Sequence, residues 1–202
     1  GQQTALLGQY APGSTFKLAT TLAMLRSGET SQATVSCPAE LNVDGRKFNN
    51  ASTYPAQFLG EIPLIQAFAQ SCNTAFINAR GEVSQASLSE AARSLGIGVD
   101  SPIGTGAYFG SVPDSAEGTA HAASMIGQGQ VLVSPFALAV AAASIGNGSL
   151  VSPVLVQQPP APGSSSPSAS ASPSATPSAE GGTPLTAQEA AALREMMRAV
   201  VT

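Results

Sequence analysis

A serine and a lysine three residues apart stand at the head of an apolar helical stretch, in the segment YAPGSTFKLATTLAML from Tyr10 to Leu25. A serine hydroxyl is a weak nucleophile at neutral pH and needs a base within hydrogen-bonding reach. Residues three apart on a helix share a face, so Lys17 can reach back to Ser14. The pair predicts a nucleophile and its base if the lysine pKa falls from about 10.4 to about 7. The alternative is a serine that only caps the helix.

The surrounding residues predict the elements that must position this pair. Apolar residues recur at helical spacing from Ser14 to Arg26, and Gly28 marks the end of that helix. Downstream, Asp44 and Gly45 stand between two short mixed segments, which is typical of a hairpin turn. We therefore expect the first helix to be followed by a β-hairpin.

Terminal residues predict three later helices. In SLSEAARSLGIG, Ser87 and Glu90 have the spacing of a capping box. Pro135 stands where a first-turn proline would open a buried helix. Thr186 and Glu189 form a second capping box ahead of AQEAAALREMMRAVV.

Composition excludes several classes of function. The 202 residues are 43% hydrophobic and 10% charged, with a formal net charge of -4. This is enough apolar material for a domain with its own core, and the lack of a basic patch excludes a nucleic-acid partner. The longest apolar run, 136–143, is far shorter than a membrane span, and the N-terminus lacks the pattern of a signal peptide. Cys37 and Cys72 lack the paired spacing of a zinc site, so we expect no metal.

The composition changes abruptly near the end of the chain. Residues 157–184 consist almost entirely of Pro, Ser, Ala and Gly and contain no large apolar side chain, which predicts a disordered insertion. Structured residues on both sides indicate one domain, formed by 1–156 and by a helix in 185–202. The chain begins at Gly1 without a methionine, and we expect it to be a segment of a longer protein.

Three segments together resemble one known family. PGSTFK at 12–17 and SCN at 71–73, within QAFAQSCNTAFINAR, are similar to two of the three active-site motifs of the penicillin-binding proteins, S-x-x-K, S-x-N and K-T-G. The segment SMIGQGQVLVSPFALAVAAASIGNGSLVSPVLV resembles the G-Q-G segment and following helix of the class B members, which are monofunctional peptidoglycan D,D-transpeptidases. The resemblance covers most of residues 8–156 and the last helix, and points to actinobacterial cell-division and septal transpeptidases.

The resemblance implies a fold and a role for each matched residue. The fold would be α+β, an α/β sandwich shared with the serine β-lactamases, and this chain would hold mostly its helical part. Ser14 would be the acylated nucleophile and Lys17 its general base. Ser71 would relay a proton toward the leaving amine, and Asn73 would bind Lys17 and the substrate's amide. The implied reaction is D-Ala-D-Ala transpeptidation between peptidoglycan stem peptides, inhibited by β-lactam antibiotics and needing no cofactor.

The third motif of the family is missing, because neither Lys17 nor Lys47 is followed by Thr-Gly. In the family, the K-T-G strand follows a helix like LREMMRAVV and supplies a cation and an oxyanion-hole N–H. We expect another segment of the same protein to bear K-T-G, part of the antiparallel sheet to be missing, and residues 1–202 alone to be incompetent as a transpeptidase. The resemblance also implies the extracytoplasmic face of the bacterial cell membrane, and a SEDS-type glycan polymerase bound through regions outside this chain.

The two cysteines either pair or remain buried free thiols. Cys72 lies inside SCN, and Cys37 follows the first helix. The oxidising compartment implied by the resemblance favours a disulfide. Such a bridge would stabilise the fold by about 3–4 kcal/mol and fix the loop that carries Ser71 and Asn73.

Other functions stay open. A β-lactam sensor or a serine β-lactamase of the same fold would differ in how fast the acyl group leaves. Class A β-lactamases add a deacylating glutamate, and Glu82, Glu90 and Glu117 lack the loop pattern expected for it. A non-catalytic wall-associated domain would also account for a missing K-T-G. His121 is not expected to be catalytic, and 127–129 are expected to pack their backbone near the site.

Overall fold

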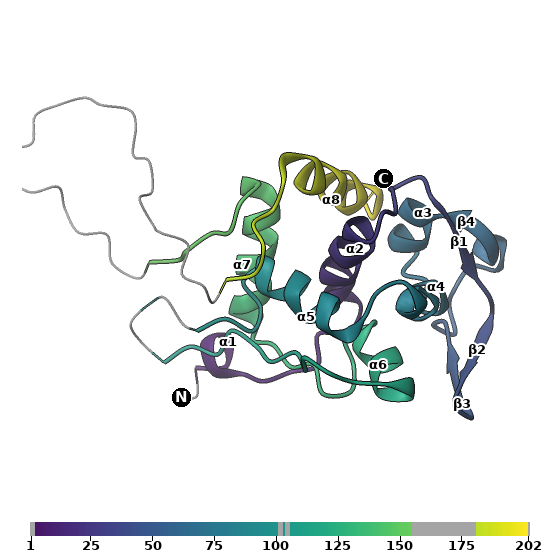
Figure 1. Cartoon of the computed structure of the whole chain (residues 1–202), viewed down its shortest axis with the longest axis horizontal. Coiled ribbons are helices and arrows are strands. Elements are labelled where there is room, and N and C mark those ends of the chain that lie inside the picture. The colour runs from purple at the N-terminus through teal and green to yellow at the C-terminus, as the bar shows by residue number, and fades with distance from the viewer. Residues whose placement is uncertain (1–2, 101–102, 104–105, 155–180, 202) are drawn as a thin grey trace, which may run out of the picture.

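Helices are the main secondary structure of the described residues, and two antiparallel strand pairs lie beside them at one end (Figure 1). The computed structural model describes residues 3–100, 103, 106–154 and 181–201. The helices within these residues are α1 (Thr4–Leu7), α2 (Lys17–Arg26), α3 (Leu64–Ala69), α4 (Asn73–Asn78), α5 (Gln85–Ser94), α6 (Gly118–Ser124), α7 (Pro135–Asn147) and α8 (Ala187–Ala199), with 3-10 turns at Gly13–Phe16, Ala56–Phe58 and Ala79–Gly81. The strands are β1 (Thr34–Cys37), β2 (Glu40–Val43), β3 (Arg46–Asn49) and β4 (Gly60–Pro63). The expected α+β class is confirmed.

Helix α2 runs through the centre of the molecule, with α5 and α8 packed against it (Figure 1). Ala19 and Ala23 of α2 and Ala91 and Ala92 of α5 are all buried. Because alanine is small, the two helices can approach closely, and their shared face forms the centre of the main core. The helix that follows the predicted nucleophile is therefore held on several sides.

The predicted first helix begins differently from the expectation. Its first turn, Gly13–Phe16, is a 3-10 turn, and the chain becomes α-helical only at Lys17. Its end is as predicted, because α2 stops at Arg26 and Gly28 follows with a φ of 109°. That backbone conformation is costly for residues with a Cβ atom, which explains the glycine.

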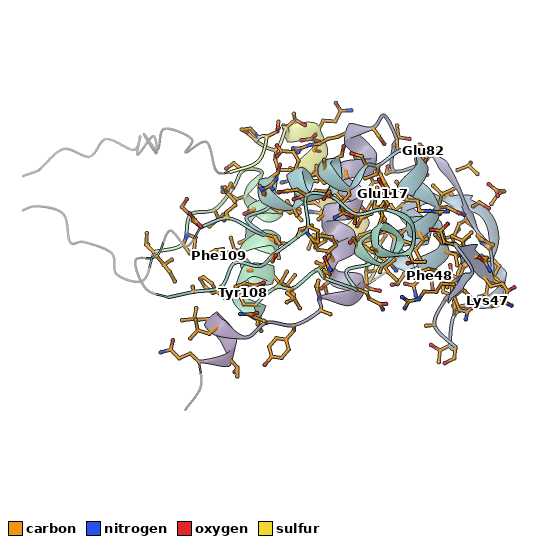
Figure 2. The ribbon with its side chains drawn as sticks, turned by 60° about the horizontal axis from the view of Figure 1, so that its bottom comes forward. Lys47, Phe48, Glu82, Tyr108, Phe109 and Glu117 are labelled. Atoms are coloured by element: carbon orange, nitrogen blue, oxygen red, sulfur yellow. A yellow bond between two sulfur atoms is a disulfide. The ribbon has the colours of Figure 1, made fainter. Side chains whose placement is uncertain are left out.

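Each strand pair is a short antiparallel ribbon. Strand β1 pairs with β4, and β2 pairs with β3 across the predicted turn, where Asp44 and Gly45 have φ values of 48° and 82°. Two successive positive φ values are typical of a two-residue type I′ hairpin turn, so this prediction is confirmed. Figure 2 shows Lys47 and Phe48 of this hairpin at one end of the molecule, and Tyr108 near α1 at the other.

The predicted capping box at Ser87 and Glu90 is wrong. Helix α5 begins one turn earlier, and Ser84 is its N-cap, with the Ser84 side chain accepting a hydrogen bond from the backbone N–H of Ser87. Val83 and Leu88 on either side of this cap are buried, as in a hydrophobic staple. Burial of these two apolar residues explains the earlier start.

The other two predicted helix starts are confirmed. Pro135 is the first residue of α7, after the N-cap Ser134. At α8 the capping box is complete: Thr186 accepts from the backbone N–H of Glu189, and the Glu189 carboxylate accepts from the backbone N–H of Thr186. None of the described helices is both long and apolar enough to span a bilayer.

Most of the predicted insertion at 157–184 lies outside the described residues. Its last four residues are described, and they pack against α5. The Thr183 N–H and hydroxyl both donate to the Glu90 carboxylate, at 2.6 and 2.8 Å. A Cβ atom at Gly182 would overlap the backbone of α5, so this glycine permits the close approach. The connection into α8 is therefore fixed to the helical core.

Candidate active site

The side chain of Lys17 lies inside the protein and ends in a cage of oxygen atoms. Only 1% of the residue is exposed. Its Nζ donates to the Ser71 carbonyl at 2.8 Å, the Ser71 Oγ at 2.9 Å and the Asn73 Oδ1 at 2.8 Å. A lysine ammonium has three hydrogens, so these contacts use all of them.

Ser14 is reached through Ser71. The Ser71 hydroxyl donates to the Ser14 Oγ at 2.8 Å, so a continuous chain of hydrogen bonds runs from the buried Lys17 to the exposed Ser14. We expected Lys17 to reach back to Ser14 directly, but its hydrogen bonds within the described residues go to Ser71 and Asn73. The loop between α3 and α4 binds the Lys17 amine and places the Ser71 hydroxyl between Lys17 and Ser14. The alternative in which Ser14 caps the helix is not supported, because the helix makes no side-chain cap bond at this end.

Burial changes the acidity of the lysine. Loss of hydration disfavours the charged form, and it lowers the pKa of Lys17 from 10.5 to about 7. The three oxygen partners are neutral, and the face of the Phe76 ring lies 5.2 Å from Nζ. Near neutral pH the amine is therefore present in both protonation states, as a general base must be.

The backbone at Ser71 is held in a conformation that glycine usually occupies. Ser71 has a φ of 58° and directly follows the end of α3. Its N–H donates to the Phe68 carbonyl, and the N–H of Cys72 donates to the Ala67 carbonyl. These two bonds make a Schellman motif, the same motif that ends α2 with Gly28 in the left-handed position. A serine with this strained backbone indicates that the hydroxyl is needed at this point.

Asn73 is the first residue of α4, and its amide is oriented from both sides. Nδ2 donates to the Asn49 carbonyl at 3.1 Å, and this leaves Oδ1 facing Lys17. The neighbouring Asn50 side chain accepts from the backbone N–H of Asn73 at 2.7 Å. Sequence reasoning missed Asn49 and Asn50. The only signal was a pair of polar residues directly after the hairpin.

A disulfide joins Cys37 to Cys72, and neither cysteine is exposed. It links the end of β1 to the middle residue of the S-x-N motif. Cys72 is also the N-cap of α4, where its Sγ accepts from the backbone N–H of Ala75 at 3.3 Å. The covalent link thus restrains the loop that bears the two polar residues of the motif.

The G-Q-G segment packs against the turn that carries Ser14. The N–H of Gly13 donates to the Gly127 carbonyl at 2.8 Å, and a side chain at Gly127 would overlap the backbone of Gly13. The prediction of backbone packing beside the site is confirmed. His121 is buried on α6, where burial and then the charge of Arg80 lower its pKa, and it has no part in the chain of hydrogen bonds to Ser14. The described residues bring together no cluster of three metal-ligating side chains.

The sequence matches a known protein family over nearly its whole length. Residues 2–202 match the family model described as the penicillin binding protein transpeptidase domain. The chain is 35% identical over 154 residues to the peptidoglycan D,D-transpeptidase PbpA of Mycobacterium tuberculosis, covering 72% of this chain and 30% of that protein. It is 32% identical over 163 residues to PbpA of Mycolicibacterium smegmatis, covering 76% of this chain and 32% of that protein. The chain thus spans about a third of the length of these relatives.

Solved structures agree with this. The imipenem acyl-enzyme complex of penicillin-binding protein A from M. tuberculosis superposes with a TM-score of 0.73 at 28% identity, over 98% of this chain and 45% of that one. The transpeptidase domain of Burkholderia pseudomallei penicillin-binding protein 3 gives a TM-score of 0.76 over 100% of this chain and 56% of that one. Its identity is 20%, so it supports the fold alone.

Proposed function

The chain belongs to the penicillin-binding protein transpeptidase family, and from that premise we propose that it carries the acylation centre of a peptidoglycan D,D-transpeptidase. Ser14 is the nucleophile, Lys17 the general base, Ser71 the proton relay and Asn73 the residue that orients the base. The observation that carries the proposal is the chain of hydrogen bonds from the buried Lys17 amine through Ser71 to the exposed Ser14 hydroxyl.

Acylation follows from this geometry. When Lys17 is neutral, it accepts the proton of Ser71, and Ser71 accepts the proton of Ser14. The Ser14 Oγ then bonds to the carbonyl carbon of the penultimate D-alanine of a stem peptide. The bond from that carbon to the terminal D-alanine nitrogen breaks, and the proton held on Lys17 returns through Ser71 to the leaving amine. The products are a Ser14 ester and free D-alanine.

The second half-reaction uses the same groups in reverse. An amine of a neighbouring stem peptide loses its proton to the relay and attacks the ester carbonyl. The new amide cross-links two strands, and Ser14 regains its proton. Asn73 keeps one Nδ2 hydrogen on the Asn49 carbonyl and has a second hydrogen for the substrate's amide.

β-Lactam antibiotics are the second class of ligand proposed for the site. Structures of penicillin-binding protein A from M. tuberculosis include acyl-enzyme complexes with imipenem and with penicillin G. In this chain, Ser14 would open the lactam ring and stay esterified, because the ring-opened amine remains attached and blocks the acceptor.

The remaining parts of the machinery are proposed to lie outside residues 1–202. A K-T-G segment of the same protein would supply the cation for the substrate carboxylate and an oxyanion-hole N–H. The whole protein would work at the extracytoplasmic face of the bacterial cell membrane, with a SEDS-type glycan polymerase as its partner. On this proposal the segment alone does not cross-link peptides.

The test is labelling of the full-length protein with a fluorescent penicillin. We expect one covalent label, mapped by peptide mass spectrometry to Ser14, lost in Ser14→Ala and stable for many minutes. Turnover within milliseconds would instead identify a β-lactamase, and no label at all would remove the proposal. Rapid labelling of residues 1–202 on their own would show that the outside segment is unnecessary.

A further inference from the structure

We propose that Asn50 is a positioning residue of the site, which caps helix α4 from the neighbouring hairpin and so fixes Asn73 against Lys17. The inference rests on the proposed function, because its consequence is a change in the acylation of Ser14. Asn50 directly follows β3 and is partly buried against the start of α4.

The contacts of the Asn50 side chain are those of a helix cap. Its Oδ1 accepts from the backbone N–H of Asn73 at 2.7 Å and from that of Thr74 at 3.1 Å. These are the first two N–H groups of α4, which have no carbonyl partner within the helix. One oxygen from outside the helix therefore fulfils the role that an N-cap side chain normally has.

The helix needs this external oxygen because its own N-cap is a poor one. Cys72 holds that position, and its sulfur is already bonded to Cys37. Sulfur is a weak acceptor, and the Cys72 Sγ contacts only the third N–H of the helix, that of Ala75. The disulfide thus replaces a normal cap, and Asn50 supplies the missing acceptor.

The opposite end of the Asn50 amide fixes its orientation. Nδ2 donates to the Pro38 carbonyl at 3.1 Å and to the Thr74 hydroxyl at 3.3 Å. An amide can accept at its oxygen and donate at its nitrogen, so these two sets of contacts fix which way the Asn50 side chain faces. The residue before it, Asn49, holds the side chain of Asn73 through its carbonyl. Two consecutive residues of the hairpin thus hold the backbone and the side chain of Asn73, and Asn73 in turn contacts Lys17.

The test measures Ser14 acylation by a fluorescent penicillin in the full-length protein. Asn50→Ala should lower the acylation rate constant about tenfold to a hundredfold, because it leaves two partly buried helix N–H groups without their acceptor. Asn147→Ala is the matched control, because Asn147 is the last residue of α7 and its side chain bonds only to Ser149 within the described residues. It should keep the wild-type rate.

A double-mutant cycle separates positioning from general stability. If Asn50 acts through Asn73, then Asn50→Ala added to Asn73→Ala should lower the rate less than about twofold further. A loss that multiplies in full in the double variant would overturn the proposal, as would a wild-type rate in Asn50→Ala.

Asn50→Asp covers the case in which the alanine variant does not fold. The carboxylate can still accept both helix N–H groups, so circular dichroism should show a folded protein. It cannot donate to the Pro38 carbonyl, and we expect a smaller loss than for alanine. A folded aspartate variant with no loss would overturn the proposed role of the amide. If the wild-type protein itself takes no label, the proposed function has failed, and this inference fails with it.

Discussion

Helix α2 carries a cation at each end, and the protein surrounds the two in opposite ways. Lys17, its first residue, is enclosed by neutral oxygens and has no carboxylate among its hydrogen-bond partners. Arg26, its last residue, forms an ion pair with Glu189 at 2.9 Å and donates to the Ser94 hydroxyl and the Thr183 carbonyl. A helix dipole disfavours a positive charge at its N-terminal end and favours one at its C-terminal end.

The difference separates a reactive group from a structural one. Burial without a counter-ion lowers the pKa of Lys17 to about 7, so that it can take up and release a proton. At the other end, burial works to raise the pKa of Glu189, but hydrogen bonds from Arg26 and Thr186 outweigh it and hold this pKa below its usual value. That ion pair keeps its charge at neutral pH and joins α8 to α2.

The largest effect is expected when the Lys17 amine is removed. Lys17→Met leaves Ser14 without a base, and acylation by a fluorescent penicillin should fall about a thousandfold. The measurement is the labelling rate in full-length protein whose fold is checked by circular dichroism. Arg26→Met is the matched control. At temperatures where this variant stays folded, its labelling rate should be within about twofold of the wild-type rate. Equal losses in the two variants would contradict the comparison.

The second prediction makes the reactive end resemble the structural one. Asn73→Asp places a carboxylate beside Nζ, which favours the ammonium and raises the pKa of Lys17. Acylation at pH 7 should fall about tenfold to a hundredfold, and much of the loss should be recovered at higher pH.

The control for this substitution is Asn42→Asp. Asn42 lies in the exposed hairpin and accepts from the N–H of Gly45, as an aspartate also can. It should keep the wild-type pH profile. A fall in Asn73→Asp with an unchanged midpoint would show that the added charge acts on something other than Lys17.

The wild-type pH profile is the third prediction. With a pKa of about 7 for Lys17, the fraction of Lys17 that is neutral should rise about tenfold between pH 6 and pH 8, and the acylation rate should rise with it. Stability should rise with pH as well, since the folded pKa lies below the unfolded value of 10.5 and the folded state therefore binds fewer protons between about 7 and 10.5. Rates measured by stopped-flow labelling should level off above pH 8, and a midpoint above about 9 would contradict a buried neutral base.

The motif residues could be predicted from the sequence because their types and local spacing carry the signal. The hairpin turn at Asp44 and the capping box at Thr186 were predictable for the same reason, since each depends on residues within one turn. The capping box at Ser87 failed because burial of Val83 and Leu88 selected an earlier start for α5, and burial depends on residues far along the chain.

What the sequence could not predict depends on contacts between distant segments. Ser71 lies between Lys17 and Ser14 because a loop more than 50 residues away adopts a left-handed backbone at a serine. Asn50 caps a helix to which it does not belong. Neither arrangement leaves a local pattern, so only three-dimensional packing brings these residues to the site.

The smallest effect on chemistry is expected at the structural end of α2. Glu189→Gln removes the carboxylate that forms the ion pair with Arg26. The side chains of Arg26 and Glu189 are only 20% and 16% exposed, so the substitution should lower the free energy of unfolding by about 1–2 kcal/mol. Because the folded pKa of Glu189 is lowered, its contribution is present above the unfolded pKa near 4.5 and is lost as the pH falls through the folded value. Melting temperatures of the variant and the wild type should therefore differ at pH 7 and converge in acid.

Glu195→Gln on the exposed face of the same helix is the control and should melt like wild type at both pH values. The acylation midpoint near pH 7 should be unchanged in Glu189→Gln, because its carboxylate lies at the opposite end of α2 from Lys17. A midpoint that moved with this substitution would mean that the two ends of α2 are coupled through the helix. Burial without a counter-ion would then be insufficient to account for the pKa of Lys17.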